Sequence, residues 1–382
     1  RIIVEREREI AAFVPDERWE LGARLSLDPA AGAALAAGWA QFIAKLDDKN
    51  KGPTIKLQNA WLAEHQALEA ELVELGGQKW ALGCTATEPR DLSAEISRAA
   101  VAAGLVDVQV TARDNPEGKG PAKVLRAVTG TVDPKVRYRV RNIETRRTSS
   151  RPPGPFITSS LQIAAANQLG FPTQRTMRTA QSLYEGVNVP GEGQVGLITY
   201  MRTDSTNLSP EAITQIRGFI EGQFGAAYLP EKPNLYSSSN KDAQEAHEAI
   251  RPTDVARTPE ALREALSEDQ FKLYNLIWQR TMGCQMTPAQ WDATSVNFER
   301  DDQKTGAVLR ATGRTLAFDG FLRAMGVTAT DEQTLPSLAE GQQLGAFAIE
   351  PVQRFGSPPP RYSEASLVKT MESEGIGRPS TY

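Results

Sequence analysis

Residues 198–205, with the sequence ITYMRTDS, bring one phenol, one guanidinium and one carboxylate together within five positions. If residues 196–200 end a β-strand, Tyr200 and Arg202 share a face, because side chains two positions apart do so. A tyrosine hydroxyl is a weak nucleophile at its usual pKa of about 10. A fixed cation beside it favours the phenolate and also holds a phosphate oxygen. The spacing therefore predicts covalent attack by Tyr200 on a phosphodiester.

Asp204 is the one carboxylate inside this stretch. It is expected either to orient Arg202 or to close a turn, since Asp, Ser, Thr and Asn follow one another here, and both roles are compatible. A guanidinium fork fixed by a carboxylate suits a phosphate. The plainer alternative is that Arg202 is an ordinary surface arginine.

Length and composition set the class of protein. The chain has 382 residues, of which 40% are hydrophobic and 24% charged, which is typical of a globular protein with two to four structural units. No stretch is long and apolar enough to span a membrane. The net charge of −4 excludes a uniformly basic protein but permits a local basic groove. Cys84 and Cys284 lie far apart, without metal-ligand spacing, and are expected to be reduced structural thiols.

The N-terminal part of the chain reads as strands around a helical block. Residues 1–10 have helical spacing, residues 19–25 alternate like a strand, and residues 30–75 predict a helical insertion rich in Ala, Leu and Glu, whose two tryptophans are expected to pack rather than to bind. Residues 91–103 predict a helix. Residues 136–143 alternate between a mostly apolar face and three arginines, and Arg146, Arg147 and Arg151 follow. These arginines form either a solvated face or a stripe that tracks phosphates.

The rest of the chain predicts a helical unit followed by more strands. A proline-rich connection at residues 151–155 leads to a helix that ends near residue 169, after a hydroxyl cap. Further helices are predicted at residues 173–185, 209–224 and 258–282. Residues 291–352 return to a β pattern, and a last helix follows. A β region split around a helical region predicts an arch with an inserted domain.

His247 is one of only two histidines, and Glu245, Glu248 and Arg251 surround it in sequence. Such a charge cluster predicts an imidazole oriented next to a phosphate, although a lone histidine is more often structural. At the C-terminus, Ser363 predicts a capped helix start. Residues 375–381, with the pattern Gly-x-Gly-Arg-Pro-Ser-Thr, offer backbone N–H groups and hydroxyls as a phosphate cradle, or form a simple helix end. No P-loop, dinucleotide fingerprint or two-carboxylate Mg²⁺ pair is visible, so use of ATP is not expected.

Four ordered motifs together resemble bacterial DNA topoisomerase I, of the type IA topoisomerase family. They are residues 153–162 (PGPFITSSLQ), 198–205 (ITYMRTDS), 246–253 (AHEAIRPT) and 362–382 (YSEASLVKTMESEGIGRPSTY). The resemblance implies that Tyr200 attacks single-stranded DNA and forms a 5′-phosphotyrosine. A second strand then passes through the gap, and the freed 3′-hydroxyl reverses the attack without ATP. Arg202 and His247 would bind the scissile phosphate, with Asp204, Glu245 and Glu248 in support. The resemblance also implies DNA contacts by further residues, namely Arg146, Arg147, Arg151, Thr158, Ser159, Gln162, Thr203, Arg251, Ser363, Arg378, Ser380 and Thr381.

The family resemblance implies a fold of mixed α and β structure in several domains. Residues 10–156 and 287–357 would form a β-rich arch, with the helical insertion near residues 30–75. Residues 157–286 would form a helical domain carrying the tyrosine, and residues 1–9 and 358–382 would be parts of a helical fourth domain. An N-terminal Toprim domain, whose carboxylates bind Mg²⁺, and C-terminal zinc ribbons would lie outside this chain. The resemblance further implies a monomer in the bacterial cytoplasm at the nucleoid.

Two other functions stay open on the sequence alone. One is a clamp that binds single-stranded DNA without cutting it. Because the chain lacks the Mg²⁺ carboxylates, it is expected to be inactive by itself. A tyrosine recombinase-like transferase, which forms a 3′-phosphotyrosine, is the other alternative. That chemistry needs several arginines and histidines around the tyrosine, which the neighbourhood of Tyr200 does not supply.

Overall fold

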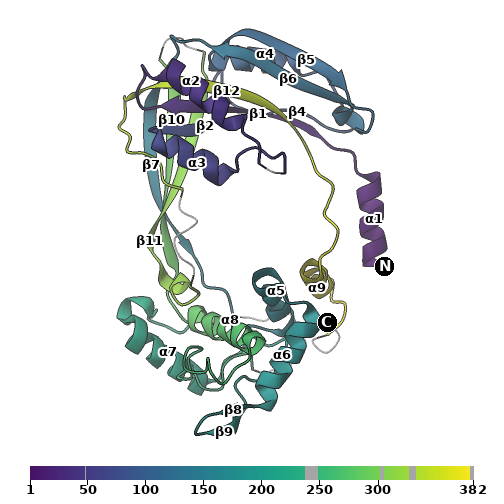
Figure 1. Ribbon diagram of the computed structural model, residues 1–382, viewed down its shortest axis with the longest axis vertical. Helices are drawn as coiled ribbons and strands as arrows, with labels where there is room; N and C mark the ends of the chain where they lie inside the picture. The colour runs from purple at the N-terminus through teal and green to yellow at the C-terminus, as the bar shows by residue number, and fades with distance from the viewer. Residues whose placement is uncertain (48, 237–247, 302–304, 327–332, 379–382) are drawn as a thin grey trace. The chain divides into compact units, whose positions relative to one another are not determined.

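The computed structural model describes residues 1–47, 49–236, 248–301, 305–326 and 333–378, and the chain divides into two compact units. Unit 1 comprises Arg1–Arg147, Asp292–Thr315 and Glu332–Pro360, and unit 2 comprises Thr148–Trp291, Leu316–Asp331 and Arg361–Tyr382. Figure 1 labels their helices and strands. The mixture of α and β structure expected from the sequence is confirmed.

Helices occur in both units. Those of unit 1 are α1 (Ile2–Ala12), α2 (Gly32–Ile43), α3 (Ile55–Glu64) and α4 (Ser93–Ala103). Those of unit 2 are α5 (Thr158–Leu169), α6 (Thr173–Glu185), α7 (Pro210–Phe224), α8 (Glu268–Cys284) and α9 (Glu364–Ser373). The last of these follows a serine cap, as the sequence predicts.

The largest sheet has eight strands in the order β3-β2-β11-β10-β7-β12-β1-β4. Its strands are β1 (Glu17–Ser26), β2 (Ala67–Leu75), β3 (Gln78–Lys79), β4 (Leu82–Cys84), β7 (Arg137–Ser150), β10 (Ala289–Arg300), β11 (Val308–Phe318) and β12 (Gln343–Phe355). Strand β1 also pairs with β2, so the sheet closes on itself. Two smaller ribbons pair β5 (Leu105–Asp114) with β6 (Val124–Val132) and β8 (Val187–Val189) with β9 (Gly193–Val195).

Strand β7 shows how the alternating sequence builds the core of unit 1. Tyr138 and Val140 are buried, whereas Arg139 and Arg141 between them are exposed, so the predicted faces are confirmed. The hydroxyl of Tyr138 donates a hydrogen bond of 2.6 Å to the carbonyl of Ala103, the last residue of α4. Gly104 ends that helix with a φ of +114°, and a side chain there would meet Val136 at 2.9 Å. Glycine thus permits the close approach of α4 to the sheet.

The helical insertion is shorter than predicted. Helices α2 and α3 pack against β12 and β2 (Figure 1), and the rings of Trp39 and Trp61 lie 5.2 Å apart, which confirms that these tryptophans pack. Residues 67–75, expected to be helical, form strand β2 instead. Their Leu and Ala side chains at alternate positions are buried while Glu71 between them is exposed, so the period of two prevailed over helix propensity.

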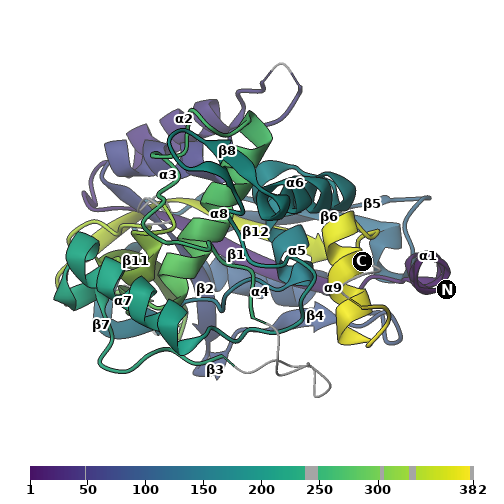
Figure 2. The same cartoon turned by 90° about the horizontal axis from the view of Figure 1, so that it is seen from below.

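Unit 2 has its own hydrophobic core. It is built around α5, α6, α7 and α8, and includes the fully buried side chains of Leu161, Leu183, Ile216 and Ile277. Helix α5 contacts α6 and α9, as Figure 2 shows from below. Residues 259–265, predicted as part of a helix, form turns, and α8 begins only after the cap at Ser267. The division into an arch, a helical domain and parts of a fourth domain, which the family resemblance implies, stays a prediction.

Two further features bear on the class of protein. Both cysteines, Cys84 and Cys284, are buried and free, as expected of structural thiols. Burial also raises the pKa of the Cys284 thiol to about 12, which makes it unreactive at neutral pH. Among the described residues, no helix combines the length and apolarity needed to cross a bilayer.

Candidate active site

The segment that carries Tyr200 is irregular rather than the strand end predicted from the sequence. Strand β9 stops at Val195, and beyond it only Ile198 forms an isolated bridge, with Pro252. The N–H of Thr199 donates to the carbonyl of Arg251 at 2.9 Å, and the N–H of Thr253 donates to the carbonyl of Leu197 at 3.0 Å. This short pairing fixes the approach to Tyr200, but the chain then bends. Tyr200 and Arg202 therefore do not share a strand face.

The first turn of α5 holds the other side of this segment. The N–H of Thr158 donates to the carbonyl of Thr203 at 2.9 Å. Its hydroxyl donates to the carbonyl of Met201 at 2.8 Å and accepts from the N–H of Thr203 at 2.9 Å. Thr158 is thus the first helical residue. The residue before the helix is Ile157, so the hydroxyl cap predicted from the sequence is absent, and the hydroxyl of Ser160 instead accepts the N–H of Ile157 at 2.9 Å. The hydroxyl of Thr158 is used to shape the loop after Tyr200.

Tyr200 is open to solvent, with 47% of its surface exposed. Its ring meets that of Tyr184, the penultimate residue of α6, edge to face at 5.3 Å between centroids. Arg202 is exposed, and Asp204 is half-buried. Thr203 and Ser205 between them are buried, and the hydroxyl of Thr203 accepts the N–H of Ser205 at 3.1 Å. The loop therefore presents the phenol and the guanidinium outward while its hydroxyls anchor it.

Glu248 and Arg251 form a second polar cluster on the segment that pairs with Thr199. The carboxylate of Glu248 accepts the N–H of Ser209 at 2.7 Å and a guanidinium N–H of Arg251 at 2.7 Å. Burial would raise the pKa of Glu248, but the hydrogen bonds from Ser209 and Arg251 outweigh it and hold the pKa below its usual range. Glu248 therefore remains an anion that also fixes Arg251. His247 and Glu245, predicted beside it, lie outside the described residues.

The remaining predicted DNA contacts are distributed over both units. Ser159 and Gln162 are buried on α5. Ser363 caps α9, and the adjacent Glu364 accepts the N–H of Thr173 at the start of α6 at 2.7 Å, so α9 belongs with unit 2. Arg151 and Arg378 are exposed in unit 2, and Arg146 in unit 1. Ser380 and Thr381 lie outside the described residues.

Arg147 does not stand free, as a dedicated phosphate contact would. Its Nε and Nη2 bind the carboxylate of Asp292 in unit 1 at 2.6 and 3.0 Å. Arg139 of the same strand pairs with Glu299 at 2.6 Å. The hydrogen bonds to Asp292 raise the pKa of Arg147 above its usual value. Phosphate binding along this strand would have to compete with β10 carboxylates, and it stays a prediction.

Three residues that contribute to the site could not be predicted from the sequence. One is Tyr184, because a single aromatic residue at a helix end has no distinctive spacing. The hydroxyl of Tyr236 donates to the carbonyl of Cys284 at 2.7 Å, and its ring packs on Gly154. The guanidinium of Arg280 lies 4.3 Å from the ring centroid of Phe156 and donates to the carbonyl of Gly154 at 3.3 Å. Tyr236 and Arg280 hold the segment that leads into α5, and no sequence signal joins such distant positions.

Comparisons with known proteins identify the family of this chain. The model of the DNA topoisomerase family matches residues 115–382. DNA topoisomerase 1 of Pseudomonas aeruginosa is 40% identical over the whole chain, which spans 34% of that relative, and DNA topoisomerase 1 of Rickettsia felis is 48% identical over 64% of the chain. Full-length topoisomerase I from Thermotoga maritima superimposes with a TM-score of 0.64 at 28% identity, over all of this chain and 48% of that one.

The chain therefore belongs to the type IA family of bacterial DNA topoisomerases. It spans about a third of the length of the curated relatives that match it over its whole length. The family resemblance drawn from the four motifs is confirmed, and so is the class of fold that it implies.

Proposed function

We propose that this chain supplies the nucleophile of an ATP-independent DNA topoisomerase that relaxes negatively supercoiled DNA. The exposed phenol of Tyr200, on a loop fixed from both sides and beside the exposed Arg202, is the observation that carries the proposal. The names of the relatives and the family match support it. We also propose a monomer that acts in the bacterial cytoplasm on single-stranded or underwound DNA.

The proposed reaction exchanges one phosphoester for another. The phenolic oxygen of Tyr200 attacks the phosphorus of a strand, a P–O(tyrosine) bond forms, and the P–O3′ bond breaks. The phenol gives up its proton and the leaving 3′-oxygen receives one. A 5′-phosphotyrosine and a 3′-hydroxyl result, and the reverse attack restores the strand. Because the covalent link conserves the bond energy, ATP is not required.

Arg202 and the hydroxyl-rich loop have separate roles in this proposal. The guanidinium of Arg202 binds the scissile phosphate and stabilises charge as it moves between the two ester oxygens. Thr158 holds the loop after Tyr200 through its bonds to Met201 and Thr203. The phenol then needs no large rearrangement to meet a phosphate, which lowers the entropic part of the barrier.

Mg²⁺ enters this proposal only through the family resemblance. Among the described residues, no group of three or more His, Cys, Asp or Glu side chains is placed to hold a metal ion. The described part of the chain thus does not form a metal site, and the proposed reaction steps use no metal ion from it. We propose that Toprim carboxylates outside these 382 residues bind Mg²⁺, so that the chain alone does not relax DNA. Mg²⁺-dependent relaxation by the purified chain would refute this.

The decisive experiment traps the covalent complex. The chain is joined to the Toprim region of the Pseudomonas relative and mixed with single-stranded DNA labelled at either end, and the adduct is resolved on a denaturing gel. Label at the 3′ end should travel with the protein, because a 5′-phosphotyrosine retains the downstream piece. Tyr200→Phe should abolish the adduct, and an adduct that survives would show that the nucleophile is another residue. Transfer of 5′-end label would instead indicate recombinase-like chemistry, and binding without any adduct would indicate a non-catalytic clamp.

A further inference from the structure

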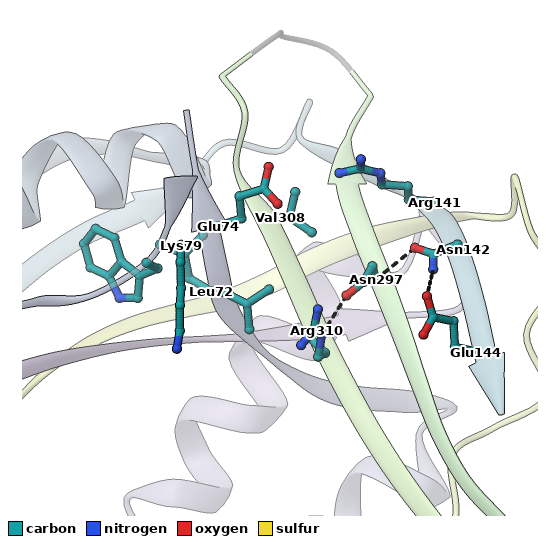
Figure 3. A pocket seen from close by; sticks show the side chains of 11 residues that line it. Leu72, Glu74, Lys79, Arg141, Asn142, Glu144, Asn297, Val308 and Arg310 are labelled. Carbon is teal, nitrogen blue, oxygen red and sulfur yellow. Dashed lines mark hydrogen bonds between the residues drawn. The ribbon is translucent and has the colours of Figure 1, made fainter. Parts of the chain in front are cut away.

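An open groove on the sheet of unit 1 has no role in the reaction described above (Figure 3). Its volume is about 680 Å³, and residues of β2, β3, β7, β10 and β11 line it. All of its lining residues belong to unit 1. Ligand sites commonly have volumes of about 300–1,000 Å³, so the groove has room for one or two nucleotides.

Three cations line this groove, and none is firmly neutralised. Arg310 donates from Nε to the amide oxygen of Asn297 at 2.8 Å, which orients its guanidinium and leaves its other donors for a ligand. Arg141 reaches Glu299 only at 3.9 Å. Lys79 is exposed and lies opposite Glu74 in the β2–β3 register, and no ion pair joins these two in the described structure. The groove can therefore accept a phosphate.

The neighbouring side chains form a polar ladder that suits a nucleobase. Nδ2 of Asn297 donates to the amide oxygen of Asn142 at 3.0 Å, and Nδ2 of Asn142 donates to Glu144 at 3.2 Å. Figure 3 shows this chain of bonds running from Arg310 on β11 across β10 to β7. Amides and carboxylates bind the hydrogen-bonding edges of bases, and aromatic rings such as that of Trp80, which also lines the groove, stack on base faces.

We infer that the groove binds one nucleotide unit of a single-stranded nucleic acid. Its phosphate is held by Arg310 and Lys79, and its base stacks on Trp80, which follows Lys79 in the chain. The carboxylates of Glu74 and Glu144 repel a second phosphate inside the groove and accept hydrogen bonds from exocyclic amines. Adenine, whose exocyclic amine can donate to these carboxylates, fits better than thymine, which has no exocyclic amine.

The test uses the 382-residue chain carrying Tyr200→Phe, so that the outcome does not depend on the proposed nucleophile. Six tryptophans give few indole N–H signals in ¹⁵N NMR spectra, and Trp80→Phe identifies the signal of Trp80. Hexadeoxyadenylate should shift this signal and bind more tightly than free deoxyadenosine monophosphate. In fluorescence anisotropy, Trp80→Ala should weaken binding of the hexanucleotide about fivefold or more, while Trp80→Phe keeps most of it.

The salt dependence of binding allows a matched control. Lys79→Ala should lower the slope of log affinity against log salt by about 0.7, the value of one phosphate contact on a single strand. Lys135, an exposed lysine of the same unit outside the groove, is the control, and Lys135→Ala should leave the slope unchanged. Equal effects of both substitutions, or binding that leaves the Trp80 signal in place, would overturn the inference. Equal affinity for the free mononucleotide would overturn the assignment to a strand.

Discussion

Replacing Thr158 by valine tests how the loop of Tyr200 is held. Valine keeps the shape of threonine but removes the hydroxyl, which donates to Met201 and accepts from the N–H of Thr203. Thr158, Met201 and Thr203 are all buried, so two backbone groups lose their partner where water cannot replace it. Each such loss costs about 1–3 kcal/mol, so we expect about 2–6 kcal/mol for the pair. Thr158→Ser, which keeps the hydroxyl, is the control.

Hydrogen exchange followed by mass spectrometry measures this cost where it arises. A peptide covering residues 199–206 should lose protection by about 30-fold or more, since 1.4 kcal/mol corresponds to a factor of ten. A peptide covering residues 19–25 of β1, in the other unit, should exchange at an unchanged rate. If Thr158→Val and Thr158→Ser open the loop equally, the hydroxyl is not what holds it, and the account of the loop is wrong.

Three further substitutions probe the same unit. Gly196→Ala should destabilise unit 2 by more than about 1 kcal/mol in urea unfolding, because the added methyl would lie 2.7 Å from the carbonyl oxygen of Tyr184, and a neutral result would contradict this packing. Tyr184→Ala should slow adduct formation by the Toprim-joined protein while Tyr184→Phe should not, because the ring makes the contact with Tyr200. Equal rates of adduct formation by the two variants would show that the ring of Tyr184 does not support the site. Glu248 has a lowered pKa, so its stabilisation is present above the usual carboxyl pKa of about 4.3 and is lost as pH falls below it. Glu248→Gln should therefore reduce the loss in free energy of unfolding between about pH 5 and pH 3. An equal loss in the variant and the unchanged protein would show that this carboxylate does not stabilise the fold.

Arg202→Ala separates chemistry from binding in the proposed reaction. We expect cleavage by the Toprim-joined protein to fall about 10²-fold or more, the usual effect of losing a donor to a reacting oxygen. DNA binding should change little, because Arg202 would supply only one of many phosphate contacts. Arg202→Lys keeps the charge but not the planar fork, and it should restore binding more fully than cleavage. Equal losses of binding and cleavage in Arg202→Ala would assign Arg202 to DNA positioning alone.

Alternation and helical spacing were enough to predict most elements of the fold. The apolar face of β7 and the helices α5, α6 and α7 follow directly from the periodicity of their residues. At residues 67–75 the prediction of a helix was wrong. Good helix formers occupy these positions, but their side chains alternate between buried and less buried along a strand. Propensity describes one residue at a time, whereas burial against β1 and β11 decides between the two structures.

The residues of the candidate site could be predicted from the sequence, but their geometry could not. The residue types around Tyr200 indicate the chemistry, because few patterns join a phenol and a guanidinium so closely. Their geometry depends on partners that are distant in the chain, namely Thr158 on one side and Arg251 on the other. A strand-like interpretation of residues 196–200 fails because the pairing in the described structure is a single bridge, between Ile198 and Pro252. The N–H of Arg251 donates to the Thr199 hydroxyl and not to a backbone carbonyl. Local pattern thus predicts the proposed nucleophile, and long-range hydrogen bonds determine how its loop is held.

The arginines of β7 show why the same residue pattern does not by itself make a DNA-binding surface. Arg139 and Arg147 are paired with carboxylates of β10 at 2.6 Å. Exposed ion pairs contribute only about 0–1 kcal/mol each, so a phosphate can displace the carboxylate at little cost, but the freed carboxylate then repels it. Arg310 differs in that the amide of Asn297 takes the place of the carboxylate. A phosphate would therefore bind at Arg310 before it bound at Arg139 or Arg147, although β7 has the denser arginine sequence.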